Sequence, residues 1–202
     1  IERVVTGSGH DTFNYALGSG AVGIDGNGGT DTVNVNGFAA SVAQTYAVGN
    51  ASGLAVTISG GTAGAIAAED VERLNLTLGN HGDTVTLTGN LGAGGAGLSN
   101  DKAHNSITGG SSNDVVDMSA MNSTTGFTMN LAGGDDTVRL GKGTSTIDGG
   151  AGTHDRLDAS HATSAVTIKL HQASNNAFGI DIGSHTVSNF EDLGGCAGHD
   201  VL

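Results

Sequence analysis

Residues 131–158 decide the fold: LAGGDDTVR (131–139), LGKGTSTID (140–148) and GGAGTHDRLD (149–158) follow one another without a gap. In the first segment a glycine pair precedes the aspartates, and polar and apolar residues then alternate from Thr137 to Leu140. Alternation with a period of two is typical of a short strand with one buried face. Glycine adopts turn conformations that other residues resist. Each segment therefore predicts a tight turn followed by a short strand.

The same unit recurs along the whole chain as Asp-Thr-apolar, or a looser form of it, after Gly-rich sequence. Its seven aspartates are Asp11, Asp31, Asp83, Asp114, Asp136, Asp155 and Asp200. A repeated unit of this size indicates a stacked, repetitive architecture, because one unit cannot bury its apolar face alone. The sequence thus predicts an all-β parallel roll or solenoid with inward-pointing apolar residues. These are Val33, Val35, Val85, Leu87, Val116, Val138, Leu140 and Leu157.

The segments GGAGTHDRL, GGSSNDVVD and TGSGHDTFN resemble the G-G-x-G-x-D-x-U-x nonapeptide of the repeats-in-toxin (RTX) proteins, where U is apolar. The resemblance covers roughly two thirds of the chain. It implies a right-handed parallel β-roll in which two nonapeptides make one coil and calcium lies between turns stacked on the same edge. Asp114, Asp136 and Asp155 are then expected on one edge. Segments 100–108 and 140–148 are expected on the other, with Asn105 and Ser145 at the aspartate position.

The resemblance also implies the calcium ligands, namely the seven aspartates together with four glycines of the turns: Gly109, Gly134, Gly150 and Gly152. Calcium takes six to eight oxygens from carboxylates and backbone carbonyls, and glycine lets a turn direct its carbonyls inward. Ser112 and His81 replace glycines, and 149–158 and 194–202 carry one-residue insertions, so some turns are expected to bind no metal. In the alternative interpretation, each aspartate only caps a turn.

Two segments that lack the nonapeptide divide the chain. We expect roll turns at 1–37, a longer-strand insert at 38–78, the main roll block at 79–158, a second insert at 159–193 and the next roll repeat at 194–202. Both inserts contain one short sequence motif and end near a second one. The second motif also occurs at the first residues of the chain, so we expect a fragment of a longer array. The shared words are Ala55-Val56-Thr57-Ile58 and Ala165-Val166-Thr167-Ile168; the closing words are Val71-Glu72-Arg73-Leu74 and Phe190-Glu191-Asp192-Leu193, with Ile1-Glu2-Arg3-Val4 as a third copy. The glutamates either bind calcium at the roll edge or cap a backbone turn.

Composition excludes several classes of partner. With 20 Asp and Glu against 7 Lys and Arg, the net charge is −13, which disfavours nucleic acid and anionic membranes. The sequence has no long apolar run for membrane insertion. Cys196 is the single cysteine, so no intrachain disulfide can form. Metal is then one candidate for stabilising a secreted domain.

Nothing in the sequence indicates catalysis. His10, His154 and His199 each precede a motif aspartate, but no helical pattern supplies the further ligands of a metal-dependent hydrolase, and we expect these histidines to face solvent. Asp135 and Asp136 are adjacent on a strand and point to opposite faces, so they cannot flank one glycosidic bond.

The sequence therefore predicts a structural calcium-binding module of a secreted or cell-surface bacterial protein, such as a surface-layer protein or adhesin exported by type I secretion. It would fold and become rigid on binding several calcium ions outside the cell. The expected partners are calcium, neighbouring copies of itself in a surface lattice, or a cell-surface polysaccharide. One alternative is a calcium-binding roll appended to a secreted protease, lipase or alginate epimerase. Another is a metal-free β-solenoid that acts as a spacer.

Overall fold

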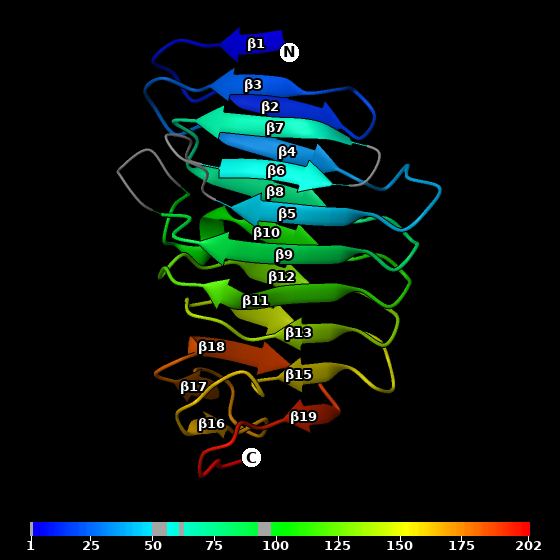
Figure 1. The fold of residues 1–202 in the computed structure, drawn as a ribbon, viewed down its shortest axis with the longest axis vertical. Coiled ribbons are helices and arrows are strands. Elements are labelled where there is room, and N and C mark those ends of the chain that lie inside the picture. Colours follow the sequence, from blue (N-terminus) through cyan, green and yellow to red (C-terminus); the bar gives the residue numbers. More distant parts are fainter. Residues whose placement is uncertain (1, 50–55, 61–62, 93–97) are drawn as a thin grey trace.

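The computed structural model describes residues 2–49, 56–60, 63–92 and 98–202 (Figure 1). Ile1 and Ala55, which open two of the recurring words, lie outside these residues. These residues are all-β: within them nineteen strands form two sheets, and the 3₁₀ turn Lys102–His104 precedes β10. No helix in the described part of the chain is long and apolar enough to cross a membrane.

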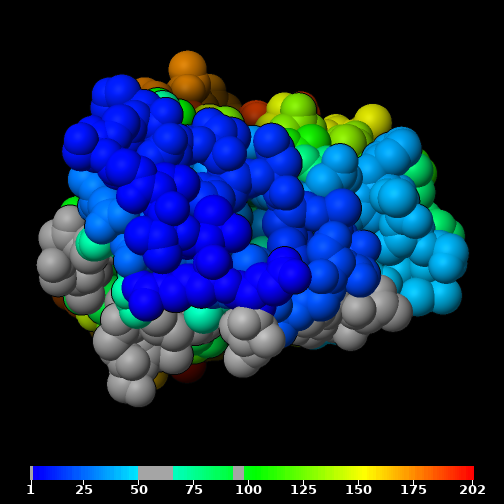
Figure 2. All heavy atoms as spheres, turned by 90° about the horizontal axis from the view of Figure 1, so that it is seen from above, coloured from blue at the N-terminus to red at the C-terminus, as the bar shows by residue number. Residues whose placement is uncertain are grey.

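The strands of each sheet stack along the long axis of the molecule, from the first coils, which Figure 2 shows end-on, to the C-terminal strand. Sheet A has the order β1 (Glu2–Val5), β3 (Val22–Asp25), β7 (Ala63–Glu69), β6 (Val56–Gly60), β5 (Thr45–Gly49), β9 (Thr84–Gly89), β11 (Val115–Met121), β13 (Thr137–Arg139), β15 (Arg156–Asp158), β19 (Asp192–Gly194). Sheet B has the order β16 (Val166–Ile168), β17 (Ala177–Gly179), β18 (Gly183–Ser188), β14 (Thr146–Asp148), β12 (Thr128–Asn130), β10 (Ser106–Thr108), β8 (Arg73–Thr77), β4 (Thr32–Asn36), β2 (Thr12–Ala16).

Between β8 and β15 the chain alternates between the two sheets, and each strand pairs in parallel with the strand one coil away. The register keeps the inward residues in columns. In sheet A, Val116 lies between Val85 and Val138, and Val138 is next to Leu157. This two-sheet stack is compatible with a β-solenoid and confirms the all-β, parallel architecture expected from the alternation.

Two antiparallel insertions interrupt the parallel pattern. In sheet A, β5, β6 and β7 form an antiparallel trio between β3 and β9, whereas β4 pairs directly with β8 in sheet B. In sheet B, β16, β17 and β18 form a second trio that joins the stack through β14. Each sheet therefore contains one antiparallel trio, and the two sheets have ten and nine strands.

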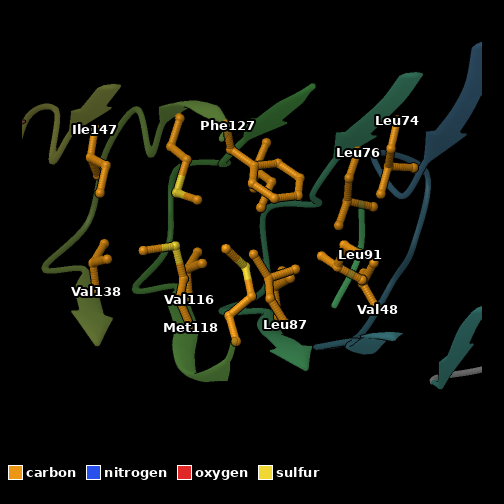
Figure 3. Packing of buried hydrophobic residues seen from close by; sticks show 14 of the residues in the cluster. Val48, Leu74, Leu76, Leu87, Leu91, Val116, Met118, Phe127, Val138 and Ile147 are labelled. Atoms are coloured by element: carbon orange, nitrogen blue, oxygen red, sulfur yellow. The ribbon is translucent and has the colours of Figure 1, made fainter. Parts of the chain in front are cut away.

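The core is the layer of apolar side chains between the sheets (Figure 3). Ile147 and Phe127 from one side face Val138 and Val116 from the other. All eight residues predicted to point inward are at most 2% exposed. The period-two pattern therefore identified the buried face correctly. It also fixes where the residue before each strand lies, which is at the edge of the stack.

Candidate functional site

The acidic ladder is a column of five carboxylates along one edge of the stack, formed by Asp83, Asp114, Asp136, Asp155 and Glu191. The four aspartates immediately precede strands of sheet A, and Glu191 lies one residue before β19. One carboxylate oxygen of each member accepts the backbone N–H of the preceding column residue. The bonds run from Gln44 N to Asp83 Oδ1 (2.6 Å), Asp83 N to Asp114 Oδ1 (2.7 Å), Asp114 N to Asp136 Oδ1 (2.6 Å), Asp136 N to Asp155 Oδ1 (2.7 Å) and Asp155 N to Glu191 Oε2 (3.0 Å).

The opposite edge begins in the same way and then becomes neutral. Asp31 Oδ1 accepts the N–H of Asp11 (2.8 Å), and Glu72 Oε2 accepts that of Asp31 (2.8 Å). Further along this edge, the side chains that accept such a bond are uncharged or weakly basic, and the register places them two residues further along their strands than Asp31 and Glu72. Asn105 Oδ1 accepts from Leu74 N, Ser145 Oγ from Phe127 N, and His185 Nδ1 from Ser145 N, each at 3.2 Å.

These contacts show on which edge of the stack most of the predicted site residues lie. Asp114, Asp136 and Asp155 share one edge, and Asn105 and Ser145 share the other, as predicted. Asp83 belongs to the acidic ladder, whereas Asp11 and Asp31 lie on the opposite edge. Of the two roles that the sequence left open for Glu72 and Glu191, the structure shows capping of a backbone N–H.

Gln44 and His185 are members of these columns that the search for aspartate missed. The dipeptide that follows each of them could have identified them: Gln44 precedes Thr-Tyr and His185 precedes Thr-Val, just as Asp136 precedes Thr-Val. The two residues that follow this position are therefore more regular than the capping residue itself. The histidines at 10, 154 and 199 are exposed, as expected.

The second oxygen of several aspartates is buried without a partner. Asp83 Oδ2 accepts the N–H of Gly79 (2.6 Å), and Asp114 Oδ2 that of Gly110 (3.1 Å). In contrast, the Oδ2 atoms of four aspartates are enclosed and accept no hydrogen bond: Asp11, Asp31, Asp136 and Asp155. Leaving a buried polar atom unpaired costs about 1–3 kcal/mol, and more for a charged group. Each of these oxygens therefore calls for a cation or a proton.

Burial and neighbouring charge make ionisation of the ladder costly. Burial, followed by the charges of Asp114, Asp155 and Asp135, raises the pKa of Asp136 to about 7, although the Asp114 N–H opposes this rise. Burial is also the main cause of the raised pKa values of Asp114 and Asp155. The ion pairs of the described residues involve other carboxylates. No basic side chain there neutralises the ladder.

The glycines of the turns make room for backbone oxygens of neighbouring coils. At Gly134, where φ is +111°, a Cβ would stand 2.5 Å from the carbonyl carbon of Ser112. At Gly152, a Cβ would meet the carbonyl oxygen of Gly134 and both oxygens of Asp155, the latter at 2.7 and 2.8 Å. Gly109 and Gly150 are similarly close to backbone of the adjacent coil. The three heavy atoms nearest to the Cβ position at Gly152, outside its chain neighbours, are thus all oxygens.

The last turn has a more accessible aspartate. Asp200 accepts the N–H groups of Val166 (3.1 Å) and Cys196 (2.6 Å). A hydrogen bond from the Cys196 thiol is the main cause of its lowered pKa. This aspartate therefore has partners for both oxygens, unlike Asp136 and Asp155.

These donors fit a hard cation only if carbonyl oxygens supply most of the ligands. Among the described residues, no three His, Cys, Asp or Glu side chains gather closely enough to hold a metal by themselves. Each turn brings one carboxylate and nearby carbonyls, the oxygen types that calcium accepts. Asp155, Asp136 and the carbonyl of Gly134 are the groups that would hold an ion in the C-terminal turns.

Two comparisons with known proteins found no match. No protein-family model matches this chain, and no curated protein does. Arguments about function therefore rest on the residues and the geometry described above.

Proposed function

We propose that this chain is a structural calcium-binding segment of a secreted or cell-surface bacterial protein, a right-handed β-roll in which calcium joins neighbouring coils. The observation that carries the proposal is the set of four buried carboxylate oxygens without partners. They lie in Gly-rich turns, and the Gly134 carbonyl oxygen and both Asp155 carboxylate oxygens lie close together beside Gly152. Calcium would supply positive charge at positions where the described residues supply none.

The spacing of the ladder makes this charge important. Strands of one sheet lie about 4.8 Å apart, so neighbouring ladder carboxylates are separated by about one strand spacing. Two unit charges at that distance repel by roughly 3 kcal/mol at an effective dielectric constant of about 20. The N–H donors offset part of this repulsion, and a cation between two turns would reverse its sign.

Several weak sites together suffice to control folding. Extracellular calcium modules have dissociation constants of about 10⁻⁴–10⁻³ M. At free calcium tenfold above that constant, each independent site adds roughly 1.4 kcal/mol. About four sites would add roughly 5–6 kcal/mol, the low end of whole-domain stability. The chain would then be stable in calcium outside the cell and only marginally stable in the calcium-poor cytosol, which suits export before folding.

The competing proposal is a metal-free spacer, and one observation favours it. Every ladder carboxylate already accepts a backbone N–H, so a proton on the other oxygen could complete the column. In that case the chain would fold without calcium, and its stability would follow the protonation of the ladder.

Calorimetric titration of the decalcified chain with calcium separates the two. We expect more than one ion per chain at millimolar calcium, with fewer ions or weaker binding in Asp136→Asn. The matched control is Asp117→Asn, which removes the same charge from the neighbouring coil but on the outer face of β11, where Asp117 pairs with Arg139 (3.1 Å). Folded protein that binds no calcium at millimolar concentration would contradict the proposal and favour the spacer.

A further inference from the structure

The seven motif aspartates fall into two groups according to the hydrogen bonds that their second carboxylate oxygen accepts. In three turns this oxygen accepts the N–H of the residue four positions earlier, so that the turn closes on its own aspartate. The bonds run from Gly79 N to Asp83 Oδ2 (2.6 Å), Gly110 N to Asp114 Oδ2 (3.1 Å) and Cys196 N to Asp200 Oδ2 (2.6 Å). We name these three the closed turns.

In the four other turns, which we name the open turns, the second oxygen is enclosed and accepts no hydrogen bond. Their aspartates are Asp11, Asp31, Asp136 and Asp155. The last three of these residues are 0% exposed. A buried carboxylate oxygen without a donor is unfavourable, and more so when the group is charged. The open turns are therefore the places where the fold needs a positive group that the described residues do not supply.

In three open turns, the N–H that would close the turn donates to another acceptor. The bonds run from Asn27 N to Asp25 Oδ1 (3.1 Å), Ala132 N to Asn130 Oδ1 (3.0 Å) and Ala151 N to the Ala132 carbonyl oxygen (2.8 Å). In the first two of these turns, the acceptor is an Asp or Asn side chain six residues before the motif aspartate. The closed turns instead have Thr77, Thr108 and Gly194 at that position. Local sequence therefore contributes to whether a turn closes.

Two open turns also place a backbone carbonyl of the neighbouring coil beside the aspartate oxygen that lacks a partner. A Cβ added to a turn glycine would contact both atoms: Asp70 O and Asp31 Oδ2 (2.5 Å) at Gly26, and Gly134 O and Asp155 Oδ2 (2.7 Å) at Gly152. Carboxylate and carbonyl oxygens are the ligands that calcium accepts. At each of these turns, two different coils therefore present such ligands to one space.

The closed turn before Asp83 shows which group distinguishes the two kinds of turn. A Cβ at its Gly79 would also lie near a carbonyl of the neighbouring coil, 3.0 Å from Gly37 O and 3.5 Å from Asp83 Oδ2. Here, however, the Gly79 N–H directs its partial positive charge at Asp83 Oδ2 (2.6 Å). A cation beside that oxygen would be repelled by the N–H and would have to displace a hydrogen bond to a charged group, which is a strong one.

From these contacts we propose that calcium binds at the open turns and that the three closed turns stay free of metal. The inference rests on the proposed calcium-binding function and narrows it from seven turns to four. The repeated motif does not make this distinction, because all seven turns contain the aspartate. Calcium would then join the coils around Asp31 and those around Asp136 and Asp155. The coils of Asp83 and Asp114, which lie between them, would be held by hydrogen bonds and core packing alone.

Two members of the acidic ladder give a matched test. Asp83→Asn and Asp136→Asn each remove one carboxylate that is at most 1% exposed. Each keeps an oxygen for the ladder N–H, from Gln44 in the first case and from Asp114 in the second. Calorimetric titration of the decalcified full chain with calcium gives the number of bound ions and their dissociation constants.

We expect Asp136→Asn to bind one ion fewer than the unaltered chain, or to bind calcium at least about tenfold more weakly, the usual scale for altered metal sites. Asp83→Asn should bind as many ions as the unaltered chain, with the same affinity. Circular dichroism in calcium establishes that each protein is folded.

A second pair of variants leaves every carboxylate in place. Asn130→Ala removes the side-chain oxygen that accepts the Ala132 N–H, so this N–H becomes free to close the turn on Asp136, and calcium binding should weaken. Thr108→Ala changes the residue that pairs with Asn130 in register and precedes the closed turn of Asp114, and calcium binding should not change. Both altered side chains are exposed, so both variants should fold.

The outcomes separate this inference from the function on which it rests. Equal losses of calcium in folded Asp83→Asn and Asp136→Asn would overturn the inference and leave the calcium-binding function in place, as would equal losses in Asn130→Ala and Thr108→Ala. A folded, unaltered chain that binds no calcium at millimolar concentration would overturn both.

Discussion

Replacing Asp136 with asparagine tests the electrostatics of the acidic ladder most sharply. Asparagine keeps an oxygen that can accept the Asp114 N–H, now 2.6 Å from Asp136 Oδ1, and it removes the buried charge. In the absence of calcium at pH 8, this change should stabilise the chain. In calcium, the same change should reduce the stabilisation of the folded chain that the ion provides.

The expected size follows from the pKa of Asp136, which rises from 3.8 to about 7. One pKa unit corresponds to about 1.4 kcal/mol, so ionising Asp136 at pH 8 costs the folded state at most about 4 kcal/mol. The residue is fully buried, but water that penetrates the turn reduces this cost. We therefore expect Asp136→Asn to stabilise the calcium-free chain by about 1–4 kcal/mol, and to lower the calcium-dependent gain by roughly 1.4 kcal/mol or more.

The assay is urea unfolding at pH 8, in chelator and in calcium, with Asp117→Asn as the charge-matched control. Asp117→Asn should lose about 1 kcal/mol, the upper value for a surface ion pair, because asparagine keeps an oxygen for the Ser119 hydrogen bonds. If Asp136→Asn destabilised the chain in chelator by more than this control, the ionised carboxylate would be compensated within the folded protein, and the reasoning would be wrong.

Three further predictions concern pH, turns and core. In chelator, stability should rise as the pH falls from 8 towards 5, because raised pKa values let the folded ladder take up protons that the unfolded chain binds only near pH 4. Burial lowers the pKa of His185, so the stability that the neutral side chain contributes is present above pH 6.5 and is lost on acidification. His185→Gln removes this loss and should therefore steepen the rise in stability as the pH falls. In saturating calcium the direction should reverse because protons compete with the ion; unchanged urea midpoints from pH 8 to 5 would contradict both statements. Gly134→Ala should cost about 2 kcal/mol or more, since φ is +111° and backbone lies 2.5 Å from the new Cβ, whereas Gly7→Ala, with open space around it, should be nearly neutral; equal thermal midpoints would refute the crowding at Gly134. Phe127→Ala should lose about 3–5 kcal/mol in urea unfolding, and a loss below about 1 kcal/mol would show that the core tolerates the cavity.

The alternation of polar and apolar residues predicted the fold because it is a local property. Side chains two residues apart on a strand share a face, so Val138 and Leu157 could be assigned to the core without knowing which strands pair. The resemblance to the nonapeptide repeat, and not the alternation, led us to expect Asp114 and Asp136 on one edge, where the Asp114 N–H donates to Asp136 Oδ1.

Other features depend on pairings that no local pattern specifies. The shared words of the two inserts indicated extra strands, but sequence alone does not say that one trio extends sheet A and the other sheet B. The roles of Gln44 and His185 were hidden because several side chains can accept one backbone N–H. The oxygens without partners at Asp136 and Asp155 depend on how far apart the coils hold the turns.

The most direct test of the central claim is thermal unfolding of the full chain with excess chelator and with millimolar calcium, followed by far-UV circular dichroism. Calcium-linked folding predicts a midpoint that rises steeply and cooperatively with calcium, because several sites of roughly 1.4 kcal/mol each act together. A midpoint that does not move, with an intact β signal in chelator, would contradict it and leave a metal-free spacer.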